Sequence, residues 1–281
     1  MTNKYHQILA INIKPELVSQ AALYSEKPII QAPDATVQLD NYIMQKTDAI
    51  LVSIYQDLSE SFLKKFINLK YIGVLGTSSK KIALNYCENN NIKVSCVYDY
   101  CDHETAEWVI LQILKFYRDQ EKPQSVYEKT LGIVGAGAVG TKLAHKAWAL
   151  GLQVNFYAPS VHSELVSLGA HALSLEELFK NSSIISFHTP PQVVWLKREF
   201  LDQLPEGALL INTCMGKIAA DHVLEQFLSQ RPDVTLIMDS IAALSYGELK
   251  NQSLMSTRSA YETIDSKNRL AHKFLANLAK K

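Results

Sequence analysis

A glycine-rich segment, GAGAVG, constrains the fold of this chain more than any other feature. Gly135, Gly137 and Gly140 follow an apolar run, TLGIV, and precede a helix-like stretch that ends at Gly151. A strand before and a helix after are the context in which the GxGxxG pattern indicates dinucleotide binding. The first glycine permits a tight turn, the second lets backbone approach a pyrophosphate, and the third allows close helix packing. The alternative is a strand-to-helix turn whose glycines serve packing alone.

The position that helps to select between NAD and NADP carries no acid. About twenty residues past such a turn, an Asp or Glu at the end of the second strand bonds the adenosine ribose. Here that strand ends FYAPS, with Ala158 in the place of the acid. Loss of the carboxylate favours NADP(H) slightly, yet no Lys or Arg lies between Ala147 and Phe179 to hold a 2′-phosphate. Ser160 and His162 are the nearby donors, so NAD and NADP both stay open.

Short apolar runs alternate with longer helix-like segments along the chain, which predicts an α/β fold with parallel sheets. The strands are expected in two sets, at 8–13, 49–55, 71–75 and 92–97, and then at 130–134, 152–157, 183–188, 208–212 and 234–238. The helices are expected at 59–66, 80–89, 103–120, 139–150, 175–179, 197–204, 220–229 and 266–281. The boundary between two domains should fall near residues 98–102, and the last helix should return to the first domain.

Composition excludes several classes of protein. Lys+Arg and Asp+Glu number 28 each, so the chain lacks the positive field on which nucleic-acid binders and polybasic membrane proteins depend. No apolar run approaches a membrane span, and MTNKYHQILAINI contains no signal-peptide core, so we expect a cytoplasmic protein. Four cysteines without a CxxC pair fit reduced thiols, and eight histidines without HxxxH or HExxH spacing predict no metal.

Several further segments, in order, resemble the D-2-hydroxyacid dehydrogenase family. They are LKYIGVLGTSSKKIAL, IKVSCVYDYCDHETAEW, the glycine turn, SIISFHTPP, PEGALLINTCMGKI, LIMDS and STRSAYET. The resemblance implies two Rossmann-like domains with parallel sheets, the nucleotide-binding domain being inserted into the substrate domain. On this basis residues 1–100 and 264–281 form a flavodoxin-like substrate domain, and residues 101–263 form the NAD(P)-binding Rossmann domain.

The resemblance also implies a set of ligand contacts. Ala138 and Val139 would contact the pyrophosphate through backbone, and Asp239 would bond the nicotinamide carboxamide, with bonding to local backbone as the alternative. Backbone amides at Thr77 and Ser78 would hold the substrate carboxylate. The remaining contacts would come from Ser160, His188, Thr189, Pro190, Thr213 and Cys214 on the cofactor and from Tyr100 on the substrate. For His188 and Thr213 a purely structural role is an equal alternative.

The catalytic set of the family is replaced. The family orients a 2-keto acid with an arginine, protonates it with a histidine, and keeps that histidine basic with a glutamate. By the resemblance, Met215 stands at the position of the arginine, Ala242 at that of the glutamate and Arg258 at that of the histidine. Met215 and Ala242 neither donate a proton nor titrate, and Arg258 stays charged at ordinary pH, so it binds anions but is a poor acid. We therefore expect no ordinary 2-keto acid reduction by the family mechanism.

Two functions remain open. One is an NAD(P)-dependent oxidoreductase that acts on a small, anionic carbonyl, imine or hydroxy acid with a non-standard proton donor. Arg258 and His103 are its candidate catalytic residues, and Arg258 is also a candidate for substrate binding. For His103 the stronger alternative is that it caps or flanks a helix start. The other is a catalytically inactive dinucleotide-binding homologue, a sensor or scaffold; retention of Asp239 and Ala260 favours the enzyme. A homodimer is the default expectation. Its usual geometry is in doubt, because the stretch between the helix at 103–120 and the glycine turn is shorter than the region that forms much of the dimerisation arm in the family.

Overall fold

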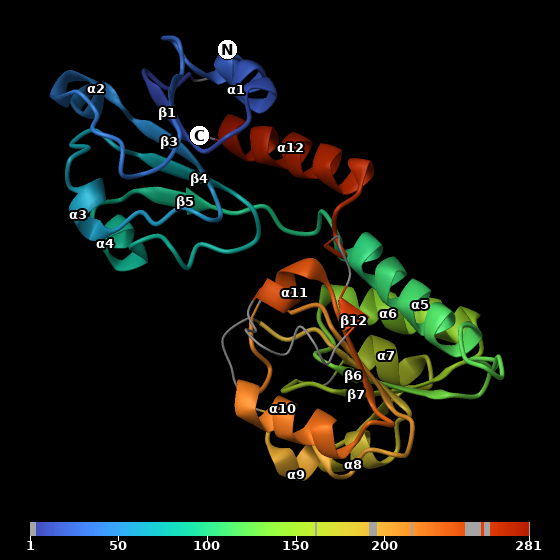
Figure 1. Cartoon of the computed structure of the whole chain (residues 1–281). Coiled ribbons are helices and arrows are strands. Elements are labelled where there is room, and N and C mark those ends of the chain that lie inside the picture. Colours follow the sequence, from blue (N-terminus) through green and yellow to red (C-terminus); the bar gives the residue numbers. More distant parts are fainter. Residues whose placement is uncertain are drawn as a thin grey trace. The chain divides into compact units, whose positions relative to one another are not determined.

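The computed structural model describes residues 4–160, 162–190, 196–214, 216–244, 254–255 and 259–280 (Figure 1). The chain divides into two compact units. Unit 1 comprises Met1–Tyr100 with Ile264–Lys281, and unit 2 comprises Cys101–Thr263. Both sheets are parallel throughout, which confirms the predicted α/β class. Within the described part of the chain, no helix is both long and apolar enough to cross a bilayer.

In its described residues, unit 1 holds a five-stranded sheet in the order β2-β1-β3-β4-β5. The strands are β1 Ile8–Ile11, β2 Ile30–Ala32, β3 Ala49–Ser53, β4 Tyr71–Leu75 and β5 Lys93–Ser95. The helices are α1 Pro15–Ala21, the 3-10 turn η1 Ala22–Tyr24, α2 Asn41–Lys46, α3 Glu60–Leu63, α4 Leu84–Asn89 and α12 Ile264–Ala279. Every residue of β1 and β3 is buried, as expected for central parallel strands covered on both faces.

The last helix, α12, returns to unit 1 and packs against β4 and α1. Arg269, Lys273 and Asn277 are spaced four residues apart and therefore share one face of this helix. Their side chains donate to backbone carbonyls of the segment 96–100 at 2.9–3.0 Å. The helix thus fixes the segment that leads from β5 out of unit 1.

Unit 2 holds, within its described residues, a seven-stranded sheet in the order β12-β11-β10-β9-β6-β7-β8. The strands are β6 Thr130–Val134, β7 Gln153–Tyr157, β8 His171–Ala172, β9 Ile184–Phe187, β10 Leu209–Asn212, β11 Thr235–Met238 and β12 Leu254–Met255. The helices are α5 Asp102–Arg118, α6 Ala138–Ala149, α7 Ser163–Ser167, α8 Leu175–Lys180, α9 Arg198–Leu201, α10 Asp221–Gln230 and α11 Ser240–Leu244. From β8 to β11 the order is that of the doubly wound Rossmann fold.

Both faces of this sheet are covered by helices (Figure 1). Successive residues of β10 show the alternation, because Leu209 and Ile211 join the cluster beneath α5 and α6, whereas Leu210 joins the cluster beneath α8 and α10. Two hydrophobic layers therefore hold β6, β9 and β10 at the centre, which is where the glycine turn begins.

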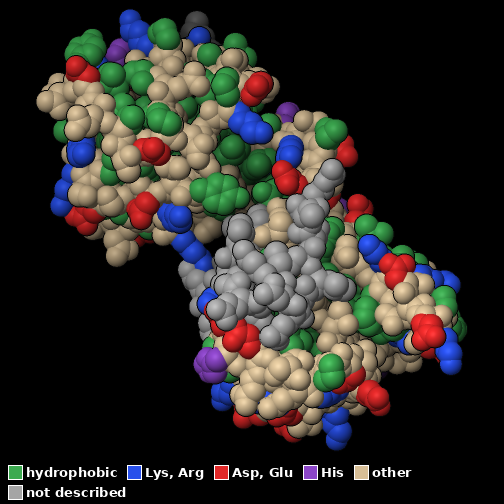
Figure 2. Space-filling view, viewed as in Figure 1, with side chains coloured by type: hydrophobic (Ala, Val, Ile, Leu, Met, Phe, Trp, Pro, Cys, Tyr) green, Lys and Arg blue, Asp and Glu red, His purple; other side chains and the backbone are tan. Residues whose placement is uncertain are grey.

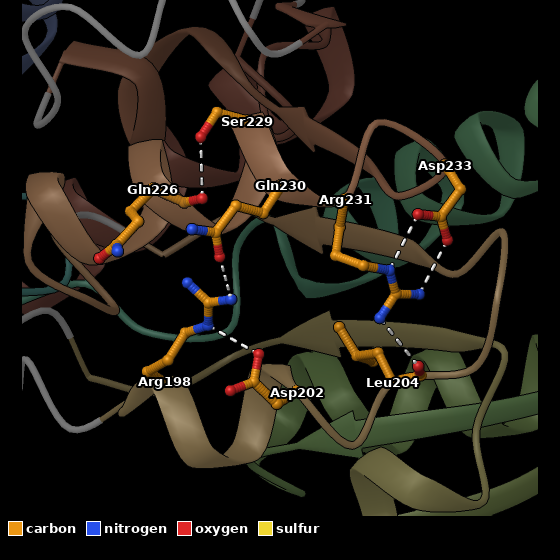
Figure 3. A network of polar contacts seen from close by, with 8 residues as sticks. All are labelled: Arg198, Asp202, Leu204, Gln226, Ser229, Gln230, Arg231 and Asp233. Carbon is orange, nitrogen blue, oxygen red and sulfur yellow. Dashed lines mark hydrogen bonds and ion pairs between the residues drawn. The ribbon is translucent and has the colours of Figure 1, made fainter.

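A polar network lies at the amino ends of β10 and β11, at the edge of the sheet opposite to the glycine turn (Figure 3). Arg231 bonds both carboxylate oxygens of Asp233 at 2.8 Å and also donates to the carbonyls of Leu204 and Pro205. This guanidinium lowers the pKa of the Asp233 carboxyl. Beside it, Arg198 joins Asp202 and Gln230. The network ties the loop before β10 to the loop before β11, and its role is structural.

Some elements differ from the sequence-based expectation. The strands β2, β8 and β12 were not expected, because edge strands of two or three residues leave no periodic pattern to detect. The short helices α1, α2, α7 and α11 were also missed, because helices of five to seven residues make too few turns to show a clear period. The helix expected at 80–89 is wrong at its start: α4 begins at Leu84, because residues before it form a turn in which the Ile82 amide bonds the Ser79 carbonyl.

Candidate dinucleotide-binding site

The three glycines of the turn after β6 have different environments. Gly135 has φ +97°, and a Cβ there would lie 2.5 Å from the His188 carbonyl oxygen. A Cβ on Gly140 would lie 2.3 Å from the Gly135 carbonyl oxygen. Gly137 has φ −74°, and no heavy atom lies within 4 Å of a Cβ built on it. Gly135 and Gly140 are therefore required by packing, whereas Gly137 leaves open space.

That open space lies at the amino end of α6. Gly137 is the N-cap, and its carbonyl accepts the intrahelical bond from the Thr141 amide at 2.9 Å. The amides of Ala138, Val139 and Gly140 precede that bond, so they belong to the first turn, whose N–H groups lack intrahelical acceptors. Free amides, a positive dipole end and room for close approach together fit the pyrophosphate of a dinucleotide.

The glycine turn also occupies the switch point of the sheet, where strand order reverses between β6 and β9. The His188 amide donates to the Val134 carbonyl at 2.8 Å, and the Gly135 amide donates to the Tyr157 carbonyl at 2.9 Å. Open α/β sheets bind ligands in the crevice at this point, outside the carboxyl ends of the strands. The same edge carries the other cofactor candidates: Ser160 after β7, His188, Thr189 and Pro190 after β9, Thr213 and Cys214 after β10, and Asp239 after β11.

His188 is held by hydroxyl groups on both ring nitrogens. Nε2 lies 2.9 Å from Ser186 Oγ, and Nδ1 lies 3.2 Å from Thr213 Oγ1. Burial lowers the pKa of His188 to about 4, so the ring is neutral near pH 7. These contacts agree with the structural alternative for His188 and Thr213. Ser186 was missed by the sequence analysis, although its place two residues before His188 on one strand face was a usable signal.

Two further buried polar groups lie at the end of β10. The Cys214 thiol is 3.6 Å from Thr189 Oγ1, and burial raises its pKa to about 11, so it stays protonated and unreactive. Asn212, which the sequence analysis did not single out, accepts from the Cys214 amide through Oδ1 at 2.9 Å. Its fully buried Nδ2 finds no hydrogen-bond partner within the described residues.

The side chain of Asp239 bonds backbone amides of two segments. Its carboxylate oxygens accept from the amides of Ala242 at 2.7 Å and Ala260 at 3.0 Å, and the side chain is only 3% exposed. The bond from Ala242 is the local backbone contact weighed as the alternative, whereas Ala260 lies 21 residues further along the chain. The contact to nicotinamide stays a prediction. Ala242, which stands in place of the family's glutamate, is completely buried.

The residues that follow β7 are those predicted to lie near the adenosine ribose. Ala158 is partly buried, and Ser160 is exposed. His162 stacks edge-on against Phe156 at 6.1 Å between ring centroids. The described residues that follow β7 thus offer a hydroxyl and an imidazole.

The substrate and catalytic candidates lie elsewhere. Thr77 and Ser78 follow β4 in unit 1 and are partly exposed, and Tyr100 is 8% exposed at the end of that unit. His103 is an exposed residue in the first turn of α5, in agreement with the helix-flanking alternative. Arg258, like Met215, lies outside the described residues. Among the residues described, no group of three His, Cys, Asp or Glu side chains is arranged to hold a metal ion.

The family model described as D-isomer specific 2-hydroxyacid dehydrogenase, NAD binding domain, matches residues 103–253. The chain belongs to the D-isomer specific 2-hydroxyacid dehydrogenase family. This confirms the resemblance drawn from the sequence. Among the family's curated relatives, the erythronate-4-phosphate dehydrogenase of Wigglesworthia glossinidia brevipalpis is 26% identical over 200 residues, covering 68% of this chain and 51% of the relative. The chain thus spans about half the length of the curated relatives it matches.

Solved structures of 2-hydroxyacid dehydrogenases share the fold. A D-lactate dehydrogenase from Aquifex aeolicus, complexed with NAD and lactic acid, is 22% identical with a TM-score of 0.81, covering 96% of this chain and 93% of its own. An acyclic imino acid reductase in complex with NADPH and D-Arg is 20% identical with a TM-score of 0.79, covering 96% of this chain and 95% of its own.

Proposed function

We propose that the protein is an NAD(P)-dependent oxidoreductase that transfers hydride between nicotinamide and a small carbonyl, imine or hydroxy acid. The observation that carries the proposal is the glycine turn. Gly137 leaves open space at the amino end of α6, at the switch point of a Rossmann sheet. A packing motif alone requires Gly135 and Gly140 but not an unfilled Gly137.

The residues on this edge divide the cofactor between them. The α6 amides of Ala138 and Val139 bind the pyrophosphate, Ser160 faces the adenosine ribose, and Asp239 is assigned to the carboxamide. The loops that flank the cofactor are His188, Thr189 and Pro190 after β9, and Thr213 and Cys214 after β10. When bound, the nicotinamide supplies or accepts the hydride, and the side chains of this edge orient it.

The proton must come from a group other than the family's histidine. His188 is a poor donor because its pKa lies near 4, so the ring is unprotonated near pH 7, and both its nitrogens are hydrogen-bonded. Burial raises the pKa of Cys214 to about 11, so this thiol is a weak acid. His103 and Arg258 remain the candidate groups. Arg258, Thr77, Ser78 and Tyr100 also remain the residues predicted to bind the anionic end of the substrate. A protonated imine needs no further proton at hydride transfer. That an imino acid reductase shares the fold supports testing imines.

Cofactor choice leans slightly towards NADP(H). The absence of an acid at Ala158 removes repulsion of a 2′-phosphate, and Ser160 and His162 are available to bond it. The D-lactate dehydrogenase of similar fold is complexed with NAD, which supports NAD as the alternative cofactor. The comparison of NAD with NADP in a binding assay decides between them.

We further propose a cytoplasmic homodimer with a small anionic substrate and no nucleic-acid or membrane partner. On the face in Figure 2, basic and acidic side chains are interspersed, in keeping with the zero net charge. Light scattering of the purified chain tests the dimer.

A catalytically inactive dinucleotide-binding homologue is the second candidate. The observation that favours it is Ala242, a fully buried side chain without a titratable group at the position of the family's glutamate. Asp239, engaged with backbone, is compatible with a protein that retained only its fold.

Thermal-shift titrations with NAD⁺, NADH, NADP⁺ and NADPH test the proposal. A ligand that binds only the folded state at about a hundredfold excess over Kd stabilises it by about 2.7 kcal/mol. We expect a shift with one oxidised and reduced pair, followed by oxidation of the reduced form when 2-keto acids are added with or without ammonium. Binding without turnover of any keto acid, imine or D-2-hydroxy acid favours the inactive homologue. No shift with any of the four nucleotides at millimolar concentration refutes both candidates.

A further inference from the structure

A cavity in unit 1 has no place in the proposed reaction. It has a volume of about 400 Å³ and lies between the loop that precedes α2, α2 itself and the short helix α3. Its apolar lining includes Leu39, Met44 and Phe62, and its polar lining includes Ser59, Ser61 and Lys65. The volume lies within the range of small-molecule sites.

The loop that forms one wall is held in place by its own side chains. Asp34 accepts from both the amide and the hydroxyl of Thr36, and Gln56 Oε1 accepts from the Ala35 amide at 3.1 Å. Asp40 then caps α2 by accepting from the Tyr42 amide at 2.7 Å. Because these bonds are already made, a ligand would bind with little ordering of the wall.

The lining selects the charge of the ligand. Lys65 is the one charged side chain that lines this cavity, and its ammonium lies 6.0 Å from the centre of the Phe62 ring. Within the described residues it makes no ion pair. The hydroxyls of Ser59 and Ser61, 3.0 Å apart, add hydrogen-bonding groups nearby. A lining of apolar and uncharged polar side chains with one cation and no acid complements a small molecule with a short apolar part and one anionic end.

The cavity continues beyond this lining. Met44 and Lys65 also line a second cavity of about 400 Å³ that extends towards Ile67, whose side chain is 73% exposed. The two cavities share Met44 and Lys65, and together they are called the groove along α2 and α3. The walls come from segments that follow β2 and β3, the two strands that flank β1.

We propose that this groove binds a small carboxylate with a short apolar chain, separately from the dinucleotide site. The carboxylate pairs with Lys65 and the two serine hydroxyls, and the chain packs against Met44 and Phe62. The site lies wholly within unit 1, so it does not depend on the proposed oxidoreductase activity.

The probe is hexanoate, with 1-hexanol as its uncharged counterpart, and binding is measured by saturation-transfer NMR titration of the full chain. The test variant is Lys65→Gln and the matched control is Lys64→Gln, which removes the same charge from the neighbouring residue. Lys64 pairs with Glu60 at 2.6 Å and does not line the cavity. Ser61→Trp is a second variant, which fills the cavity from an exposed position.

We expect saturable hexanoate binding that Lys65→Gln weakens roughly two- to fivefold, the range of an exposed ion pair. Lys64→Gln should bind hexanoate like the unaltered chain, Ser61→Trp should not bind it, and 1-hexanol should bind more weakly. The proposal is overturned if hexanoate does not saturate, if Ser61→Trp binds it undiminished, if the two lysine variants behave alike, or if 1-hexanol binds as tightly. A nucleotide thermal shift that persists in Ser61→Trp separates failure here from failure at the dinucleotide site.

Discussion

Replacing Gly137 with alanine should weaken dinucleotide binding while leaving the fold intact. The new methyl group meets no heavy atom within 4 Å, and φ at this position is −74°, which alanine adopts readily. The same substitution at Gly140 places a Cβ 2.3 Å from the Gly135 carbonyl oxygen and 3.1 Å from Ile133 Cγ2. Gly140→Ala is therefore the matched variant in which packing fails.

The two substitutions differ in expected free energy. For Gly137→Ala, the smaller entropy of the unfolded chain contributes about 0.4–1 kcal/mol, and the poorer N-cap offsets a similar amount. The midpoint of unfolding should therefore move by no more than a few degrees. For Gly140→Ala, relief of the overlap requires movement of backbone and costs about 1–3 kcal/mol. In the cofactor complex, the Gly137→Ala methyl group occupies the approach to the pyrophosphate, and a similar overpacking cost corresponds to tenfold weaker binding or more.

The assay pairs urea denaturation with nucleotide titration for each variant. We expect Gly137→Ala to unfold at the original urea concentration and to lose its nucleotide-dependent stabilisation. Gly140→Ala should unfold at lower urea whether or not nucleotide is present. Unaltered nucleotide affinity in Gly137→Ala would refute the pyrophosphate assignment, and a collapse of its stability would make Gly137 a packing residue like its neighbours.

Three further outcomes follow from the described contacts. Arg231→Ala should lower the free energy of unfolding by about 1–2 kcal/mol, because a two-bond pair with Asp233 is lost; an unchanged urea midpoint would contradict this. Lys273→Met should speed amide hydrogen exchange in residues 96–101, since its ammonium holds two carbonyls there, whereas unchanged exchange would show that the segment is held by other contacts. The pKa of His188, about 4 instead of 6.5, keeps the folded state unprotonated while the unfolded state takes up a proton. Stability should be full above pH 6.5 and fall by up to about 3 kcal/mol towards pH 4, and His188→Gln should flatten this loss.

The sequence by itself determined the parts of the protein that depend on local pattern. A hydrophobic period predicts the long buried strands and the helices α5 and α6, and glycine spacing predicts the turn at Gly135 to Gly140. Both patterns are recognised within one segment, without knowledge of what packs against it. The replacement of the catalytic set by Met215, Ala242 and Arg258 is a prediction from the sequence alone. These features identify the fold class, the family and the kind of ligand.

Tertiary structure decided what depends on residues far apart in the chain. That Gly135 cannot carry a side chain follows from the His188 carbonyl, 53 residues later, and the low pKa of His188 follows from its burial. Asp239 turned out to bond the amide of Ala260, a contact with no local signal. The edge strands and the cavity beside Lys65 exist only because distant segments pack together. Burial and hydrogen-bond partners are properties of the folded chain, so a residue's charge state and role at the site emerge only when its neighbours are in place.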